Sequence, residues 1–363
     1  MRRLKGDDGS IAVIVAICMV ILLGFTTIVV DVGRLYAERR QLQNGADAGS
    51  LAVALDCAKG SCAGTVSAMT TATGQANANA NDNATTVSQV CGNAPGLSAC
   101  SPAAPQAAWD CPAIPAYAAS AKYVMVRTQT LSNGSGVIPP SFARVISPGY
   151  TGTTVKACAR ASYGAPSSAD TIAVTESLCE WNAATSNGTS YAPAPPYPPN
   201  PSSAVERVIY LHTTTKAGSC KAGPSGADLP GGFGFLDDPA STCQVVVSTS
   251  GTYGDNTGTS VSKPCKDAIS AAQANKTVIY LPIYNSVTGT GTNGVYTLQG
   301  FAAFVVTGYS LPGFNAKSWL TGQFPCSGSD KCISGFYTQG LIPNGGTIGS
   351  GPSLGATVVQ LTG

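Results

Sequence analysis

Residues 11–56 decide the fold; they read IAVIVAICMVILLGFTTIVVDVGRLYAERRQLQNGADAGSLAVALD. The first twenty of them, 11–30, contain no charged side chain. Twenty residues of α-helix rise about 30 Å, which is the thickness of the hydrocarbon core of a bilayer. We therefore predict a transmembrane helix at 11–30. Residues 31–56 lack proline and are rich in Ala, Leu, Gln, Glu and Arg, so we expect the helix to continue beyond the membrane.

Basic residues precede the apolar run and predict its orientation. Arg2, Arg3 and Lys5 lie within residues 1–10, and segments rich in Lys and Arg stay in the cytoplasm. We expect 1–10 to be a cytoplasmic tail and the chain after Asp31 to be exported, in a single-pass protein of the cell membrane. A cleaved signal peptide would have an apolar core of about 7–15 residues and a small-residue cleavage site. The longer run here, followed by helix-forming sequence, favours a retained signal anchor.

The helix after the anchor carries one stripe of apolar and small side chains. These residues recur at helical spacing, which indicates a packed face. The pattern leaves two interpretations open: an amphipathic helix packed on its own domain, or a contact between subunits. The residues are Leu35, Leu42, Ala46, Gly49 and Val53.

The cysteines indicate an oxidising compartment. Cys18 lies in the apolar run and stands apart from the other twelve, whose even number in a loop-rich, charge-poor chain predicts disulfides. A zinc site would show CxxC spacing, and the chain has none. Sequence does not fix the pairing, but short spacing suggests 57 with 62 and 326 with 332. The twelve are Cys57, Cys62, Cys91, Cys100, Cys111, Cys158, Cys179, Cys220, Cys243, Cys265, Cys326 and Cys332.

Composition argues against several functions. Charged residues make up 10% of the 363 residues and the net charge is +2, against roughly 25% charged residues in an average soluble domain. Nucleic-acid binding needs basic patches, so we expect no nucleic-acid partner. The single histidine, His212, argues against a histidine-rich metal enzyme and is interpreted as structural because it lies in an apolar stretch. With the cysteines paired, we expect no enzyme, no cofactor, no metal and no small-molecule substrate.

Beyond residue 56 the pattern predicts an α+β chain with a β-rich end. Residues 57–165 are interpreted as a small α+β unit, 166–204 as a strand plus a proline-rich linker, and 205–363 as a β-rich domain stapled by disulfides. Residues 71–83 are expected to be helical, and 165–169 to be a break. Strands are expected at 85–90, 121–130, 153–163, 172–181 (carrying Cys179), 205–213, 244–249, 276–285, 295–311 and 355–361.

A motif of fixed spacing runs through the N-terminal segment: Gly9 and the apolar run, then Asp31, Gly33 and Arg34, and later Ala46, Asp47 and Ala48. By this motif the segment resembles the Flp pilus-assembly TadG-like proteins. Those proteins begin with a glycine and an apolar anchor, followed by Asp-x-Gly-Arg and a helix that ends in an Ala-Asp-Ala stretch. The resemblance continues more weakly through 122–166, which implies a TadG-like unit over 57–165. It also implies membership of the Tad (tight adherence) system and partners among other Tad pilus-assembly proteins. The matching residues are Gly9, Asp31, Gly33, Arg34, Leu42, Gln43, Ala46, Asp47 and Ala48.

Two functions follow from these observations. The first is a membrane-anchored, exported, non-enzymatic component of a bacterial Tad/Flp pilus assembly or adhesion system. The alternative is an extracellular binding or adhesion protein that uses a Tad-type anchor and is not needed for pilus assembly. A search for surface pili and for adhesion, measured separately, would distinguish them.

Overall fold

The fold is seen in a computed structural model, which confirms the predicted α+β class: a long apolar N-terminal helix, then a β-rich domain with several disulfides. His212 lies outside the part of the chain that the structure describes. The described residues are 8–60, 62, 64–100, 111, 121–197, 199–211, 220, 233–249, 251–254, 261–288, 294–343 and 346–363.

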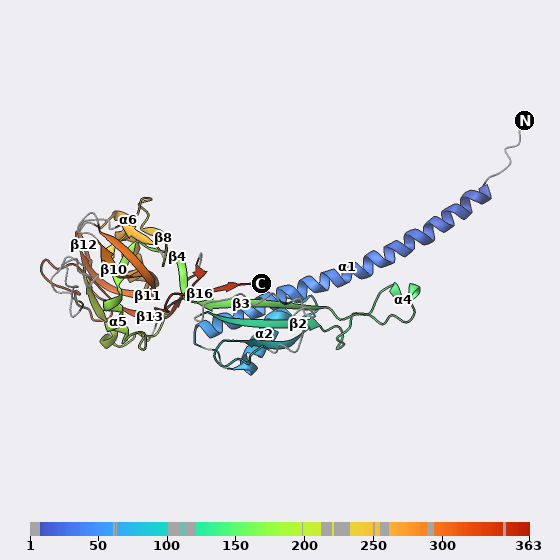
Figure 1. The fold of residues 1–363 in the computed structure, drawn as a ribbon, viewed down its shortest axis with the longest axis horizontal. Coiled ribbons are helices and arrows are strands. Elements are labelled where there is room, and N and C mark those ends of the chain that lie inside the picture. Colours follow the sequence, from blue (N-terminus) through green and yellow to red (C-terminus); the bar gives the residue numbers. More distant parts are fainter. Residues whose placement is uncertain are drawn as a thin grey trace, which may run out of the picture.

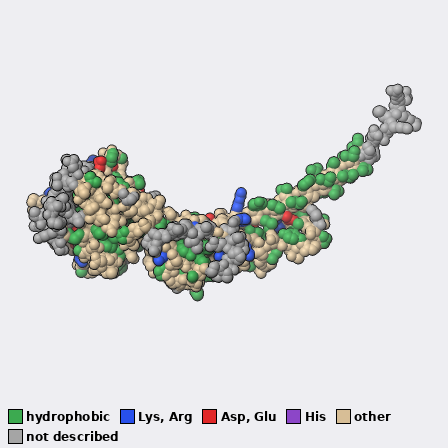
Figure 2. All heavy atoms as spheres, viewed as in Figure 1, with side chains coloured by type: hydrophobic (Ala, Val, Ile, Leu, Met, Phe, Trp, Pro, Cys, Tyr) green, Lys and Arg blue, Asp and Glu red, His purple; other side chains and the backbone are tan. Residues whose placement is uncertain are grey.

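Helix α1 runs without interruption from Asp8 to Ala58, over 51 residues. Residues 11–23 are exposed throughout and those from 24 to 30 mostly so, whereas the second half of the helix packs against the rest of the chain (Figure 1). Figure 2 shows hydrophobic side chains along the whole free part of the helix. The described part of the chain has one helix long and apolar enough to cross a membrane, and it is this one.

The N-terminal unit combines α1 and α2 (Thr65–Ala78) with a five-stranded sheet of order β1-β2-β3-β16-β14. Successive side chains of a strand point to opposite faces, so Val124 and Val126 share the face that packs on Val53 of α1 and Ala72 of α2. The helix expected at 71–83 is α2, which begins earlier, at Thr65, and ends earlier, at Ala78. The strands are β1 (Thr85–Gly92), β2 (Lys122–Thr130), β3 (Lys156–Gly164), β14 (Gly340–Leu341) and β16 (Ala356–Leu361).

Strand β16 returns the end of the chain to the N-terminal unit. The strand expected at 355–361 forms, but it pairs antiparallel with β3, from Val358 opposite Gly164 to Leu361 opposite Ala161. The buried Arg160 holds the segment that follows, because its Nη2 donates to the Thr362 carbonyl oxygen at 2.6 Å. Residues of the stretch 205–363 therefore do not all form one sheet, since β14 and β16 join the sheet of the N-terminal unit.

The C-terminal domain is built on an eight-stranded sheet whose main path is β6-β13-β11-β10-β5-β7, with β9 and β12 both paired to β11. Its centre is the antiparallel pair of β10 and β11. A second sheet has the order β15-β4-β8. The strands are β4 (Pro166–Ile172), β5 (Val174–Ser177), β6 (Arg207–Tyr210), β7 (Phe233–Phe235), β8 (Gln244–Ser248), β9 (Thr252–Gly254), β10 (Val278–Thr288), β11 (Val295–Leu311), β12 (Phe314–Ala316), β13 (Cys332–Thr338) and β15 (Thr347–Ile348).

Three segments of the chain from residue 165 onward differ from the sequence-based expectations: two helices and one strand. The single strand expected at 172–181 is wrong: the chain is helical from Leu178 to Thr185 (α5), and Cys179 lies in that helix. The Ser177 hydroxyl caps α5 by accepting from the Glu180 N–H, which stops the strand. The break expected at 165–169 is also wrong, since β4 begins at residue 166. Helix α6 (Lys263–Asn275), capped by Ser262, was not expected.

The proline-rich stretch 189–204 is fastened to the C-terminal domain. The Ala192 N–H donates to the Tyr337 carbonyl oxygen at 2.9 Å, and the Thr338 hydroxyl donates to the Ala192 carbonyl oxygen at 2.9 Å. Further along, the Tyr197 ring lies 5.8 Å from the Trp319 ring. The stretch leads into a short 3₁₀ helix, η1 (Ser203–Val205), and so runs along the surface of the domain that it enters.

The connection between β2 and β3, residues 131–155, forms an arm that extends away from the sheet beside α1 (Figure 1). Its two limbs are joined where Ile138 and Thr153 exchange backbone hydrogen bonds of 2.9 and 3.2 Å. Its tip carries the one-turn helix α4 (Ala143–Ile146).

Candidate functional site at the junction of α1 and the N-terminal unit

Asp31, the first charged residue after the apolar run, binds the tip of the β2–β3 arm. Its carboxylate accepts from the backbone N–H groups of Ser141 at 2.7 Å, Phe142 at 3.1 Å and Ala143 at 2.6 Å. Arg34, one turn further along α1, donates from Nη1 to the Ser141 hydroxyl. The two charged residues of the Asp-x-Gly-Arg motif therefore act together on one loop.

The protonation of Asp31 follows from these contacts. Desolvation raises the pKa of the carboxyl group, but the three backbone donors and the Arg34 charge together outweigh it and leave the pKa below its usual value. The carboxylate is therefore ionised at neutral pH, as a strong acceptor of three N–H bonds should be.

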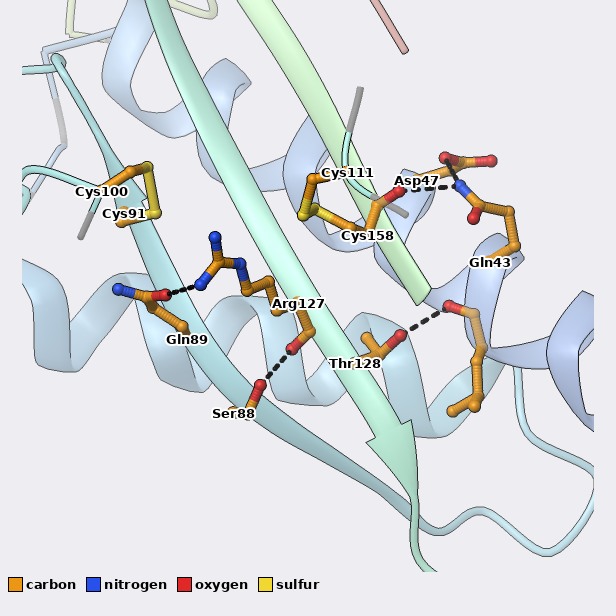
Figure 3. The surroundings of a disulfide bond; sticks show 11 residues. Gln43, Asp47, Ser88, Gln89, Cys91, Cys100, Cys111, Arg127, Thr128 and Cys158 are labelled. Carbon is orange, nitrogen blue, oxygen red and sulfur yellow. Dashed lines mark hydrogen bonds between the residues drawn. A yellow bond between two sulfur atoms is a disulfide. The ribbon is translucent and has the colours of Figure 1, made fainter. Parts of the chain in front are cut away.

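The next part of α1 is fixed to β2 and β3 by side chains that bridge helix and sheet (Figure 3). Gln43 donates from Nε2 to the Cys158 carbonyl oxygen at 3.2 Å and to Asp47 Oδ1 at 2.9 Å. The buried Thr128 hydroxyl donates to the Leu42 carbonyl oxygen at 2.9 Å. The bond from Gln43 to β3 and the bond from β2 to Leu42 set the rotation of α1 on the sheet, because each joins a fixed position of the helix to a fixed position of a strand. The bond to Asp47 lies within α1.

Small residues let α1 and α2 approach closely. A Cβ built on Gly45 would lie 3.0 Å from Cα of Ala76, and one built on Gly49 would lie 3.3 Å from the carbonyl oxygen of Ala72. In the predicted stripe, Leu42, Ala46, Gly49 and Val53 are buried inside the chain, whereas Leu35 is half-exposed. The structure thus brings four of the five together against the chain's own sheet and α2. Of the five residues, Leu35 is the one that is still exposed enough to contact another subunit.

Six disulfides surround this core and staple the C-terminal domain. The bond between 57 and 62 closes the end of α1, and Figure 3 shows two more, 91–100 and 111–158, close together on the sheet. Cys18 is free and exposed in the apolar part of α1. The pairs are Cys57–Cys62, Cys91–Cys100, Cys111–Cys158, Cys179–Cys220, Cys243–Cys265 and Cys326–Cys332.

Sequence reasoning overlooked a buried acid in the C-terminal domain. Glu176 of β5 is fully buried, and burial raises its pKa to about 8. Neither carboxyl oxygen makes a hydrogen bond among the described residues, and the buried Tyr337 hydroxyl makes none either. The adjoining cavity, about 10 Å³, has room for one water at most. The available signal was the position of Glu176 just after the apolar stretch 172–174, in a strand that reads Val-Thr-Glu-Ser.

The other reactive or metal-binding side chains of the described part of the chain do not come together to form a catalytic site. No cluster of three His, Cys, Asp or Glu residues is found there. Sequence reasoning also passed over a G-x-S-x-G string at 351–355, but strand β16 follows it, whereas a nucleophile elbow leads into a helix. The Asp238 carboxylate accepts a hydrogen bond from the Cys243 N–H.

A groove of about 630 Å³ lies between the two units. The end of α1 contributes Ala58 and Lys59, the proline-rich stretch contributes Tyr191 and Pro193, and β10 contributes Tyr280. Aromatic and aliphatic side chains therefore line much of the groove, together with one basic side chain and the polar side chains of residues 338 and 339.

The fold and the junction define a protein in which a long apolar N-terminal helix docks on an α+β unit. Residues 9–56 match the family described as "Putative Flp pilus-assembly TadE/G-like". The matched segment contains the apolar run and the junction residues Asp31, Arg34, Gln43 and Gly49, and it supports involvement in the Flp pilus-assembly system. The α1 helix fits membrane anchoring. No curated protein and no solved structure matches the chain.

Proposed function

We propose that the protein is a membrane-anchored, exported, non-enzymatic component of a bacterial Tad/Flp pilus assembly system. The observation that carries the proposal is the coincidence of the matched segment with the junction. Asp31, Gln43 and Gly49 all lie in the 9–56 match, and each contacts the unit that follows. The segment is thus an anchor built to hold a folded domain at a membrane.

The orientation of the protein is N-terminus in the cytoplasm and all folded parts outside. Arg2, Arg3 and Lys5 precede the apolar run, which favours this direction. Six disulfides support an oxidising compartment for everything from residue 57 onward. Its partners are other proteins of the Tad apparatus, contacted through the surface of the folded units.

A gene deletion in the bacterium that encodes the protein tests this function. Loss of surface pili, restored by the wild-type gene, is expected. A gene that encodes the Asp31→Asn variant should restore pili poorly, because a neutral amide accepts weaker hydrogen bonds than the carboxylate from the backbone N–H groups of the arm. Asp170→Asn is the matched control, since Asp170 is an exposed aspartate of β4, and should restore them fully. Normal pili in the deletion strain would refute the assembly role.

A second function is favoured by the groove between the units. A bitopic adhesion protein would use such an aromatic and aliphatic surface to bind an extracellular target. The same deletion strain decides between the two: intact pili with lost adhesion would establish the binding role, whereas lost pili would establish assembly.

A further inference from the structure

The tip of the β2–β3 arm is held at the end of the apolar run. Asp31 follows directly on the uncharged residues 11–30, and its carboxylate binds the backbone N–H groups of residues 141–143. Figure 1 shows the arm lying beside α1 and α4 next to the helix. Any bilayer that surrounds 11–30 therefore has its surface at the height of this tip.

The tip presents apolar side chains to its surroundings. Val145 is 81% exposed and Phe142 is 45% exposed, although both belong to a loop that is fixed by hydrogen bonds. Residues 139–147 read PPSFARVIS, and their one charged side chain, Arg144, is exposed too. Contact of these apolar side chains with water is unfavourable, and covering them with an apolar surface would lower the free energy.

Residues of α1 that follow Asp31 are also of the kinds that favour a membrane surface. Tyr36, five positions after Asp31 on α1, is 66% exposed. Aromatic side chains are enriched at the level of the lipid headgroups, and arginine is attracted there by anionic lipids. Phe142 and Arg144 supply both kinds of contact at the tip itself. Arg34 and Tyr36 lie about 4.5 and 7.5 Å further along α1 than Asp31.

We propose that the tip of the arm, residues 139–147, is a second membrane contact, which places Phe142 and Val145 in the headgroup region of the outer leaflet. The proposal rests on the proposed membrane anchoring of α1. A single helix leaves a protein free to tilt, whereas a helix and a fixed apolar tip contact the bilayer at two points. The arm therefore sets the angle at which the N-terminal unit stands on the membrane.

Spin labels on the full-length protein in phosphatidylcholine–phosphatidylglycerol nanodiscs test the proposal. In a Cys18→Ser background, Val145→Cys provides a single free thiol at the tip, because the other cysteines are disulfide-bonded. Val66→Cys is the matched control, since Val66 is an equally exposed valine, at 83%, on α2. Collisions with molecular oxygen and with a water-soluble nickel chelate are measured at each label.

The label at 145 should lose collisions with the nickel chelate and keep those with oxygen, whereas the label at 66 should collide freely with both. Equal nickel collisions at the two positions would overturn the proposal. Dipolar broadening of the 145 spectrum by a neighbouring copy would overturn it as well, because a second chain would then cover the tip. A spin label on the native Cys18 distinguishes the membrane contact of the tip from the anchoring of α1. If the label at 18 lies in lipid and the label at 145 in water, the tip contact alone is refuted. If the label at 18 lies in water, the anchoring is refuted.

Discussion

Replacement of Gly49 by leucine tests whether α1 packs on its own unit. A Cβ at this position would lie 3.3 Å from the Ala72 carbonyl oxygen and 3.4 Å from Cα and Cβ of the same residue. Leucine adds three more carbons toward the backbone of α2, and overpacking of this kind costs about 1–3 kcal/mol. The gain in helix propensity, up to about 1 kcal/mol, is smaller. The atoms in the way are mostly backbone, so we expect a cost in the upper part of this range, about 2–3 kcal/mol, and a net loss of about 1–2 kcal/mol.

Thermal unfolding of the full-length protein in detergent micelles, followed by circular dichroism, measures this loss. At roughly 4 °C per kcal/mol for a unit of this size, Tm should fall by about 4–8 °C. Gly74→Leu on α2 is the matched control, because nothing lies within 4 Å of a Cβ there, and it should leave Tm unchanged or raise it. If Gly49→Leu unfolds at the wild-type temperature or above, the helix does not pack on α2 as described.

Three further predictions concern titration, thiols and the arm. The pKa of Glu176 is raised from 4.5 to about 8, so between these pH values the unfolded chain has released a proton that the folded chain keeps. Stability should therefore fall by ~5 kcal/mol as pH rises through this window, at about 1.36 kcal/mol per unit, and Glu176→Gln should flatten the dependence in urea unfolding. Thiol titration under denaturing, non-reducing conditions should find Cys18 as the single reactive thiol, and four or more thiols would contradict the pairing. Asp31→Asn should speed hydrogen exchange at the amides of 141–143, with those of β4 unchanged as an internal reference; equal exchange in both proteins would show that Asp31 does not hold the arm.

Local patterns predicted the parts of the fold that depend on local physics. The uncharged run and the helix-forming residues after it are sufficient to specify one long helix, and β11 forms at the predicted residues 295–311. Cys57 and Cys62 are close enough in sequence to suggest their bond. Helix α6 also had a signal, Ser262 followed by Pro264 at the start of the helix, which was overlooked.

Long-range partners could not be read from the sequence. The acceptor role of Asp31 depends on residues 110 to 112 positions away, and the pairing of β16 with β3 joins segments nearly 200 residues apart. Local periodicity describes which face of an element is apolar, but it does not say which other element covers that face. The burial of Glu176 has the same origin, because its surroundings come from β10, β11 and β13.

The junction makes α1 a rigid connection between the apolar run and the sheet. The helix has no break between residues 30 and 31, Asp31 and Arg34 bind the arm at one end, and the disulfide of Cys57 closes the other. A flexible linker would allow the folded units to rotate independently of the anchor, whereas α1 itself is hydrogen-bonded to β2 and β3. The C-terminal domain is in turn tied to that sheet where β3 leads into β4, where β13 leads into β14, and where β16 returns to β3. A tilt of the anchor therefore turns the sheet with it, and a pull on the C-terminal domain reaches the anchor through these backbone connections.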